Sequence, residues 1–373
     1  MKKVQLILKV TNGCNLRCKY CYNGGKHFKE GIMGPEIVDK AISLFDGFDC
    51  IQVIFHGGEP MLGGLSFYQK VLEIEDYYTA KRGVLFDNVV QTNATLIDDK
   101  WLSFFKKNRF SIGISFDGID NESYRGETEK VLSSLTKIRK AKVPVNAIAV
   151  VSNPKYDIGA NYDYFKSLDL GVDFAFAVNE GSAKEIDLMS NKDYTDQMAK
   201  LFKRWIYDKD GTPIRNFIFT LRKIFHCCKE YCGNGSCVGN FFCVDTDGTI
   251  YGCSHESVKQ FAFGNVMDME KHHDIINAPM FKTYLLGSIN RRKVCMEKCA
   301  YFDYCKGGCV DYALLGGDIN KPNEEYCYQF KTLFNLAKAT VDEIFEKKIP
   351  LNELNPSFRK VLAESADSRE MAE

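Results

Sequence analysis

Short apolar runs alternate with longer amphipathic segments through the first half of the chain. Six runs are rich in Val, Ile and Phe, which is typical of buried strands, and they cover Val4–Thr11, Ile51–His56, Leu85–Thr92, Ser111–Phe116, Val143–Ser152 and Val172–Val178. Segments of helical spacing lie between them, for example Pro35–Phe45, Phe67–Lys81, Asp98–Lys107 and Glu129–Ala141. Such alternation implies parallel strands with right-handed crossovers. The pattern predicts an α/β fold, an open, partial (β/α)6 TIM-like barrel rather than a closed eight-fold one.

The alternation stops near residue 210. A predicted helix at Lys192–Tyr207 leads into the turn sequence Asp210-Gly211-Thr212-Pro213. Residues 227–327 then hold 11 of the 15 cysteines and few long periodic segments, so we expect metal to replace a large apolar core. A helix at Tyr328–Phe345 closes this region. We therefore predict a barrel over residues 1–210, a small Cys-rich domain over 211–345, and a charged, frayed tail over 346–373.

Composition narrows the class of protein. The 49 basic residues balance the 49 acidic ones, which argues against nucleic acid or an anionic membrane as the main partner. No apolar run is long enough to span a membrane. The first nine residues imitate a signal peptide only until Lys9, so we predict a β-strand in a cytoplasmic protein. Because the cytosol keeps thiols reduced, clustered cysteines there indicate metal rather than disulfides.

Three cysteines directly follow the first predicted strand. Cys14, Cys18 and Cys21 have the spacing C-x3-C-x2-C, and three thiolates in one loop can hold three irons of a [4Fe–4S] cube. The fourth iron would be free to bind a small molecule. The alternative is a zinc loop with a distant fourth ligand, but zinc knuckles favour C-x2-C pairs, and active sites occur at this end of barrel strands.

This segment, including Tyr20 before the last cysteine, resembles the signature of the radical S-adenosylmethionine (SAM) superfamily. The resemblance implies a cluster whose open iron chelates SAM and a reductant such as flavodoxin or ferredoxin. One electron would cleave SAM to a 5′-deoxyadenosyl radical, which abstracts a hydrogen atom from the substrate.

Polar residues at the ends of the next strands fit the same resemblance, which assigns to SAM Gly57, Gly58, Glu59, Pro60, Asn93, Ser115, Asp117 and Arg125. Two adjacent glycines let a backbone approach a ligand closely, and Glu59 offers acceptors for an ammonium group. The alternatives are an ordinary glycine turn, capping of tight turns by Asn93 and Asp117, and a surface role for Arg125.

Eight further cysteines resemble the SPASM domain that follows the barrel in radical SAM enzymes acting on peptides and proteins. Carried over by position, a first auxiliary [4Fe–4S] cluster would be held by Cys237, Cys243, Cys253 and Cys309. A second would be held by Cys295, Cys299, Cys305 and Cys327. With the SAM cluster this makes three clusters. The departure is the three-residue spacing between Cys295 and Cys299, where the family has two, and the alternative is a pair of structural zinc sites. No role is assigned to Cys50, Cys227, Cys228 or Cys232.

Two activities of the SPASM group compete. One is a peptide maturase, which cross-links a ribosomally made peptide through a thioether, carbon–carbon or ether bond by net two-electron oxidation. The other is an anaerobic sulfatase-maturating enzyme, which oxidises Cys or Ser to formylglycine. A non-catalytic iron–sulfur electron carrier is a third, distinct possibility.

The residue after Cys253 favours the maturase. The sulfatase-maturating enzymes that the chain resembles place an Asp there as the base, whereas this chain has Ser254, a poor base, followed by His255 and Glu256 as displaced candidates. Only 13 residues precede Cys14, so we expect any leader peptide to be recognised by a separate protein.

Overall fold

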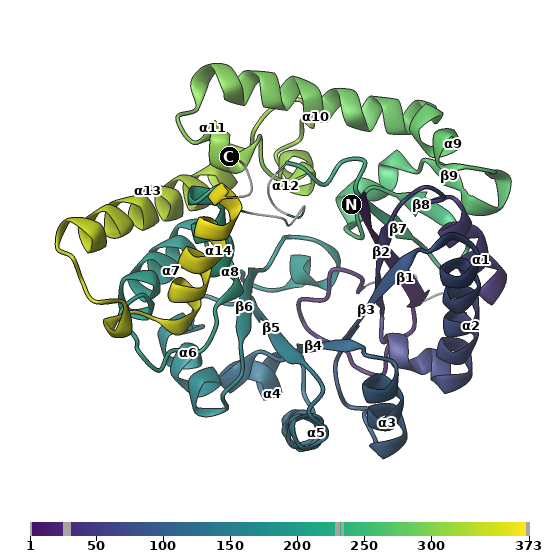
Figure 1. Cartoon of the computed structure of the whole chain (residues 1–373), viewed down its shortest axis with the longest axis horizontal. Coiled ribbons are helices and arrows are strands. Elements are labelled where there is room, and N and C mark those ends of the chain that lie inside the picture. The colour runs from purple at the N-terminus through teal and green to yellow at the C-terminus, as the bar shows by residue number, and fades with distance from the viewer. Residues whose placement is uncertain (1, 25–30, 228–231, 233–234, 371–373) are drawn as a thin grey trace.

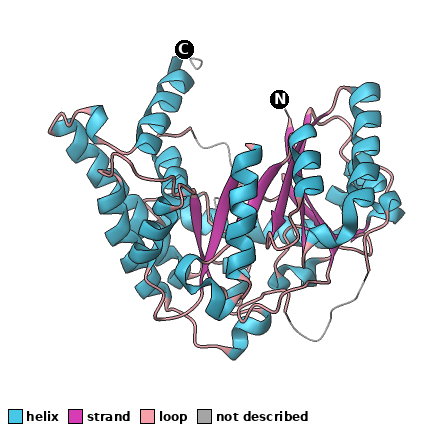
Figure 2. Ribbon diagram, turned by 90° about the horizontal axis from the view of Figure 1, so that it is seen from below, coloured by secondary structure: helices cyan, strands magenta, loops and turns pink. Residues whose placement is uncertain are grey.

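The fold is an open, curved sheet with helices packed around its outside (Figures 1 and 2). The computed structural model describes residues 2–24, 31–227, 232 and 235–370. The strand order is β6-β5-β4-β3-β2-β1-β7-β8-β9. The six parallel barrel strands are β1 Lys3–Thr11, β2 Cys50–Gly57, β3 Leu85–Thr92, β4 Ser111–Ser115, β5 Val145–Val151 and β6 Val172–Phe176. All six runs predicted from the sequence are therefore strands of a partial barrel.

Helices connect these strands and cover the outer face of the sheet. Those of the barrel are α1 Pro35–Ser43, α2 Gly64–Arg82, α3 Asp99–Lys107, α4 Asn121–Tyr124, α5 Thr128–Ala141, α6 Ile158–Ser167 and α7 Asn191–Trp205. Local chemistry sets several of their ends. Pro35 occupies the first turn of α1, where its missing N–H has no helical partner. The Asp98 carboxylate accepts from Trp101 N at 2.9 Å and begins α3. Gly83 ends α2 at φ +70°.

The core between sheet and helices is continuous and rich in aromatic rings. Phe55 of β2 and Tyr68 of α2 have ring centroids 4.9 Å apart, and Tyr68 meets Trp101 of α3 edge to face at 5.1 Å. Phe105 and Phe110 complete this group. Such packing locks α2 and α3 against the sheet, so the strand ends that carry the polar residues have fixed positions.

The sheet continues into the Cys-rich region. β7 Phe241–Val244 pairs in parallel with β1, placing Cys243 opposite Ile7. The antiparallel strands β8 Thr249–Tyr251 and β9 Gly264–Asn265 extend it. The remaining helices are α8 Arg215–Ile224, α9 His272–Asn277, α10 Pro279–Lys298, α11 Phe302–Cys305, α12 Val310–Leu315, α13 Glu324–Glu346 and α14 Pro356–Glu370. Backbone pairing thus attaches the Cys-rich region to the first barrel strand.

One sequence expectation about the C-terminus is wrong. As far as residue 370, where the described part of the chain ends, the tail is not frayed, because α14 packs on α8, with Phe358 fully buried and its ring 6.4 Å from that of Phe225. Arg222 and Glu364 form an ion pair at 2.9 Å between the same helices. A few buried aromatic and aliphatic side chains are enough to hold a helix whose other positions are charged.

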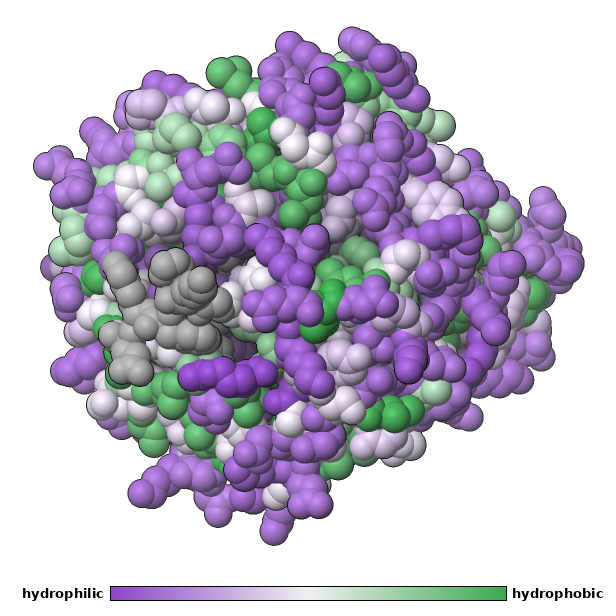
Figure 3. Space-filling model, turned by 180° about the vertical axis from the view of Figure 1, so that it is seen from behind, coloured by the Kyte–Doolittle hydropathy of each residue, from purple (hydrophilic) through white to green (hydrophobic). Residues whose placement is uncertain are grey.

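On the face seen in Figure 3, hydrophilic residues predominate and hydrophobic ones are scattered among them. None of the described helices combines the length and the apolarity needed to cross a membrane.

Candidate functional site

The three cysteines of the first loop lie together at the carboxyl end of β1. Burial raises the pKa of the Cys14 thiol, and it raises the pKa of the Cys18 thiol to about 11. Cys21 adds to both shifts by Coulomb repulsion, and Arg125 opposes them. Thiols that resist ionisation alone are deprotonated when a metal binds them. This donor set therefore fits the cationic core of an iron–sulfur cluster.

The glycines after β2 allow two backbones to meet. A Cβ atom on Gly57, whose φ is +122°, would lie 2.2 Å from Thr11 O, and one on Gly58 would lie 2.1 Å from Gly13 O. The main chain makes use of this approach, since Gly58 N and Glu59 N each donate to that segment at 2.8 Å. The residues expected to receive SAM are therefore fixed against the loop that carries Cys14.

Glu59 supports this arrangement from within. Its side chain is fully buried, and its carboxylate accepts hydrogen bonds from Met61 N (3.0 Å), Thr92 Oγ1 (2.8 Å) and Asn93 N (2.7 Å). Burial raises the pKa of Glu59, and these donors oppose the shift. Pro60 begins the short 3-10 helix that follows. The carboxylate thus joins the ends of β2 and β3 and fixes the position of the segment from Gly57 to Pro60.

Arg125 and Asp117 are brought together by Tyr20. The Arg125 guanidinium donates to Tyr20 Oη at 2.7 Å, and that hydroxyl donates to the Asp117 carboxylate. Asp117 also accepts from Val150 N at 2.9 Å, so it is part of a buried network rather than only a turn cap. Arg125 lies close enough to Cys18 to oppose the rise in its pKa.

The other two predicted SAM residues are tied to neighbouring polar side chains. Ser115 accepts from Gln91 Nε2 at 2.9 Å. Asn93 donates to Asn15 Oδ1 at 2.8 Å and lies 3.9 Å from Cys14 Sγ. Both therefore lie at the carboxyl ends of strands on the side of the cysteine loop.

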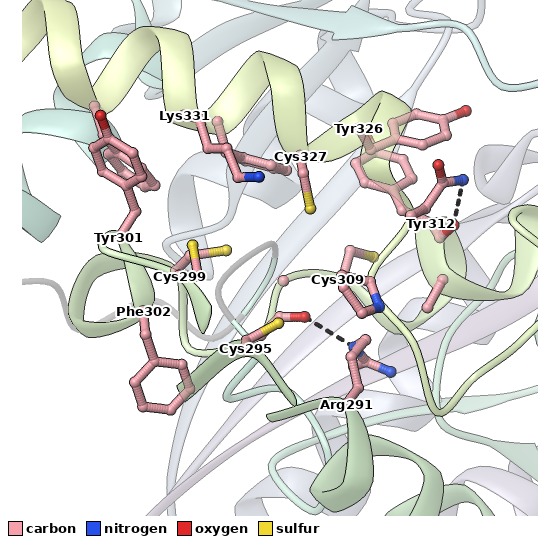
Figure 4. Close-up of a pocket in the computed structure, with 18 residues that line it drawn as sticks. Arg291, Cys295, Cys299, Tyr301, Phe302, Cys309, Tyr312, Tyr326, Cys327 and Lys331 are labelled. Atoms are coloured by element: carbon pink, nitrogen blue, oxygen red, sulfur yellow. Dashed lines mark hydrogen bonds between the residues drawn. The ribbon is translucent and has the colours of Figure 1, made fainter. Parts of the chain in front are cut away.

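The second group of thiols separates into two sites. The thiols of Cys295, Cys299 and Cys327 lie around one cavity (Figure 4), which Cys305 and Cys309 also line. Coulomb repulsion from Cys305 contributes to the raised pKa of Cys295 and of Cys327. This cavity matches the residues carried over for the second auxiliary cluster.

The residues carried over for the first auxiliary cluster lie nearer β1. Burial raises the pKa of Cys253 and of Cys309. Coulomb repulsion from Cys309 raises the pKa of Cys253 further, and repulsion from Cys237 does the same for Cys309. Cys243 is fully buried on β7, where it packs with Ile7 and Phe241, and Cys237 packs against this hydrophobic group. Cys237, Cys253 and Cys309 thus lie within electrostatic range of one another, and the thiol of Cys232 acts on all three. Cys243 of β7 lies beside Cys237.

A buried arginine lies between the two groups of thiols. Arg291 of α10 is fully buried and donates to Gly307 O at 2.8 Å and Ile319 O at 2.7 Å. Burial lowers its pKa, while thiols of both groups, Cys309 and Cys295, act in the opposite direction. A fixed cation there suits two anionic thiolate clusters.

Three rings that the sequence did not connect meet between the cysteine loops. Tyr22 follows Cys21, His255 lies two residues after Cys253, and their rings stack at 4.9 Å. His56, at the end of β2, has its ring 6.4 Å from that of Tyr22. Burial lowers the pKa of His56 to about 4, with Lys9 and His255 adding to the effect. This ring group lies between the expected SAM cluster and the first auxiliary cluster.

Two carboxylates hold His255 in place. His255 Nδ1 lies 3.1 Å from Glu180 Oε2 and 3.4 Å from Asp311 Oδ2. The ligand atoms of the three residues all lie within 4.8 Å of one another, close enough for a cation. Ser257 already donates to both carboxylates, its backbone N to Glu180 at 2.7 Å and its hydroxyl to Asp311. The group is thus satisfied by protein donors alone.

The candidate bases lie in different surroundings. Ser254 is buried and hydrogen bonds to Tyr22. Glu256 pairs with Lys259 at 3.0 Å and its side chain is half exposed, so of the two predicted bases only His255 belongs to the ring group. Among the unassigned cysteines, Cys50 and Cys227 are buried, and Cys228 lies outside the described residues. Cys232 is an exposed residue, but its thiol acts on those of Cys237, Cys253 and Cys309, and burial raises its pKa.

Comparison with known proteins agrees with this geometry. The family model of the radical SAM superfamily matches residues 8–167. A cysteine-type anaerobic sulfatase-maturating enzyme from Clostridium perfringens is 30% identical over 362 residues, covering 90% of this chain and 97% of the relative. A radical SAM cyclopropyl synthase, TigE, from Paramaledivibacter caminithermalis is 25% identical, covering 93% of this chain and 75% of the relative.

A solved structure is similarly close. Native anSMEcpe with bound AdoMet and Cp18Cys peptide superposes with a TM-score of 0.80 and 28% identity, covering 93% of this chain and all of that one. Membership of the superfamily implies one [4Fe–4S] cluster and SAM. The chain is a SPASM-type member of the radical SAM superfamily, in the family of the anaerobic sulfatase-maturating enzymes.

Proposed function

We propose that this protein oxidises a Cys or Ser side chain of a polypeptide to formylglycine. The observation that carries the proposal is the match along almost the whole length of a cysteine-type sulfatase-maturating enzyme, Cys-rich region included. The sequence pattern alone favoured the cross-linking maturase, and the similarity favours the alternative instead.

The chain would hold three [4Fe–4S] clusters on the eleven cysteines named above. When bound, the SAM cluster supplies the electron that cleaves SAM to the radical, and the radical takes a hydrogen atom from the substrate. Gly57 to Pro60 and Arg125 would hold the amino acid end of SAM. The Tyr22–His56–His255 ring group would form a wall beside the substrate and limit the access of water.

The proposed oxidation removes a hydrogen atom, a proton and an electron from the substrate, and each of the three has an acceptor. A Cys side chain would lose a hydrogen atom to the radical, a proton to a base and an electron to an auxiliary cluster, which would leave a thioaldehyde. Water then converts it to the aldehyde and releases hydrogen sulfide. A Ser side chain losing the same three species gives the aldehyde directly.

A cross-linking maturase remains the second candidate because of one observation. No carboxylate follows Cys253, since the residue is Ser254, and its hydroxyl bonds to Tyr22. The nearby carboxylates of Glu180 and Asp311 are engaged by His255 and Ser257. A substrate thiolate, partly ionised at neutral pH, needs less help from a base when it forms a thioether.

One experiment separates the two. The reconstituted protein is incubated with SAM, a reductant and a peptide carrying a sulfatase-type Cys or Ser motif, and a hydrazide probe then detects aldehyde. We expect labelling that depends on SAM and is absent in Cys18→Ala. Release of 5′-deoxyadenosine without labelling, together with a mass loss of two hydrogens from a different Cys-containing peptide, would support the maturase instead.

A further inference from the structure

A buried tyrosine inside the first cysteine loop connects an arginine to a carboxylate. Tyr20 stands between Cys18 and Cys21 in the sequence and is 6% exposed. Its hydroxyl accepts a hydrogen bond from Arg125 Nη1 at 2.7 Å and donates one to the carboxylate of Asp117, which is 1% exposed. The guanidinium and the carboxylate are thus joined through one hydroxyl group.

The turn that carries Arg125 is fixed by other bonds. Asn121 is fully buried, and its side chain joins the two ends of the turn, accepting from Asp117 N at 3.2 Å and donating to Gly126 O at 3.0 Å. Arg125 N also donates to Asn121 O at 2.8 Å. These bonds determine where the Arg125 main chain lies, but they leave its long side chain free to turn.

A backbone bond holds the cysteine loop against this turn. Lys19 N donates to Tyr124 O at 2.9 Å, and these two residues directly precede Tyr20 and Arg125 in the chain. The two main chains should therefore stay side by side when the Tyr20 hydroxyl is removed. The hydroxyl instead determines the direction of the Arg125 side chain.

The hydroxyl leaves most of the guanidinium available. A guanidinium has five N–H donors in a planar fork that matches a carboxylate, and Tyr20 engages Nη1. In the described part of the chain, the Arg125 side chain makes no other hydrogen bond. A direct, bidentate pair with Asp117 would occupy two of the donors. With Tyr20 between them, Asp117 stabilises the cation, and Nε and Nη2 remain for the carboxylate of a ligand.

We propose that the Tyr20 hydroxyl is a positioning group for SAM. It holds Arg125 in the direction in which the guanidinium receives the carboxylate of SAM, and Asp117 acts through this hydroxyl rather than by contact with SAM. The inference rests on the proposed placement of the amino acid end of SAM at Arg125. Phenylalanine keeps the ring and removes only the hydroxyl, so in Tyr20→Phe the binding of SAM must order the arginine side chain again. Ordering one such side chain weakens binding roughly two- to tenfold.

The test measures the binding of SAM and needs neither turnover nor a peptide. The full chain is reconstituted anaerobically and kept oxidised, so that SAM binds without being cleaved, and equilibrium dialysis gives its dissociation constant. We expect Tyr20→Phe to bind SAM roughly two- to tenfold more weakly than wild type, with unchanged iron content. Decarboxylated SAM, which has no carboxylate for Arg125, should bind wild type and Tyr20→Phe equally.

A double-mutant cycle tests whether Tyr20 acts through Arg125. Arg125→Ala should weaken SAM binding by itself, and adding Tyr20→Phe should cause no further loss, because the two residues act on SAM as a unit. The matched control is Tyr156→Phe. The Tyr156 side chain is also buried, and its hydroxyl donates to the main-chain oxygen of Asp117 at 3.2 Å. This variant removes a buried hydroxyl from the same residue without changing Arg125, so the affinity for SAM should not change.

Any of three results would overturn the proposal. They are equal affinity for SAM in Tyr20→Phe and wild type, the same fold-loss from Tyr20→Phe with and without Arg125→Ala, and an equal loss in Tyr156→Phe. Should Tyr20→Phe not take up iron, Asp117→Asn gives a second reading, since it weakens the acceptor of the Tyr20 hydroxyl and should weaken SAM binding only while Arg125 is present. Failure of aldehyde formation would not affect these readings, whereas unchanged affinity in Arg125→Ala would refute the placement of SAM and the inference with it.

Discussion

Replacing Glu59 by Gln tests whether its carboxylate supports the SAM segment. The carboxylate accepts from two backbone N–H groups, Met61 N and Asn93 N, one on each oxygen, and from the Thr92 hydroxyl. Glutamine has a single acceptor oxygen. In either orientation of the amide, its NH2 group faces one of the two backbone donors, whereas the Thr92 hydroxyl can rotate.

The loss of stability in Glu59→Gln can be worked out from the hydrogen bonds that the variant loses. A hydrogen bond to a charged acceptor contributes about 1.5–3 kcal/mol, and a buried donor left without an acceptor costs about 1–3 kcal/mol. Removing a buried charge offsets part of this, since burial disfavours the ionised Glu59. We expect a net loss of about 3 kcal/mol. With an unfolding entropy of about 2.1 cal/mol/K per residue, the melting temperature of the 373-residue chain should fall by roughly 4 °C.

Function should respond at the same segment. Loss of these bonds lets the segment from Gly57 to Pro60 leave its native conformation, which SAM must then restore on binding. Each 1.4 kcal/mol of binding free energy used for this weakens the affinity for SAM about tenfold. Calorimetric melting and equilibrium dialysis of SAM measure the two effects.

The matched control is Glu75→Gln. Glu75 of α2 is also a buried carboxylate, but it accepts one bond, from Asn88 Nδ2 at 2.7 Å, which a glutamine oxygen can accept. We expect no loss of stability and no change in SAM affinity. Equal losses in both variants, or none in Glu59→Gln, would refute the assignment of a supporting role to Glu59.

Three further outcomes are expected. Burial raises the pKa of Glu75 to about 7, so ionisation of this carboxyl destabilises the folded state. The free energy of unfolding should fall by at most about 3 kcal/mol as pH rises from about 4.5 through 7. The urea midpoint of Glu75→Gln should not show this decrease with pH. Cys18→Ala should abolish release of 5′-deoxyadenosine, whereas Cys305→Ala should retain it and lose product formation, as chromatography will show. Phe358→Ala should cost about 3–5 kcal/mol and make α14 sensitive to limited proteolysis, and an unchanged digestion pattern would contradict the packing on α8.

The barrel was predictable because its strands carry a strong local signal. Runs such as Leu85–Thr92 are Val-rich and bounded by polar turns, and this run coincides with β3. The 20-residue helix α10 was missed for the opposite reason. Its buried positions include Gly287, Ser288 and Arg291, so helical spacing is present but an apolar pattern is not. The prediction of a frayed tail was wrong for a similar reason, because Phe358 stands in a sequence that is otherwise mostly charged.

Cluster ligands and polar partners differ in how far the sequence reveals them. Cys14, Cys18 and Cys21 are readable because one loop supplies them at fixed spacing. Glu180, His255 and Asp311 come from three segments that only the fold brings together, 75 residues separating the first two, and none stands in a recognisable motif. Their role at the site is a consequence of tertiary packing, in which the loop after β6 reaches the cysteine loop through Ser182 N and Cys21 O at 2.9 Å.

The same packing explains why Ser254 alone does not decide the activity. A base need not occupy one position along the chain, since the fold places a ring and two carboxylates beside it. Position 254 instead determines how a side chain is held. A side chain directly after Cys253 is held by the cluster loop, whereas His255 is held by Glu180 of the barrel and Asp311 of α12. Weakening either carboxylate should therefore disturb His255 and its stacking on Tyr22 without removing a thiol ligand. The expected result for Glu180→Gln is an intact iron content with more 5′-deoxyadenosine released per product formed. Loss of iron in that variant would instead mean that Glu180 serves the assembly of the cluster region.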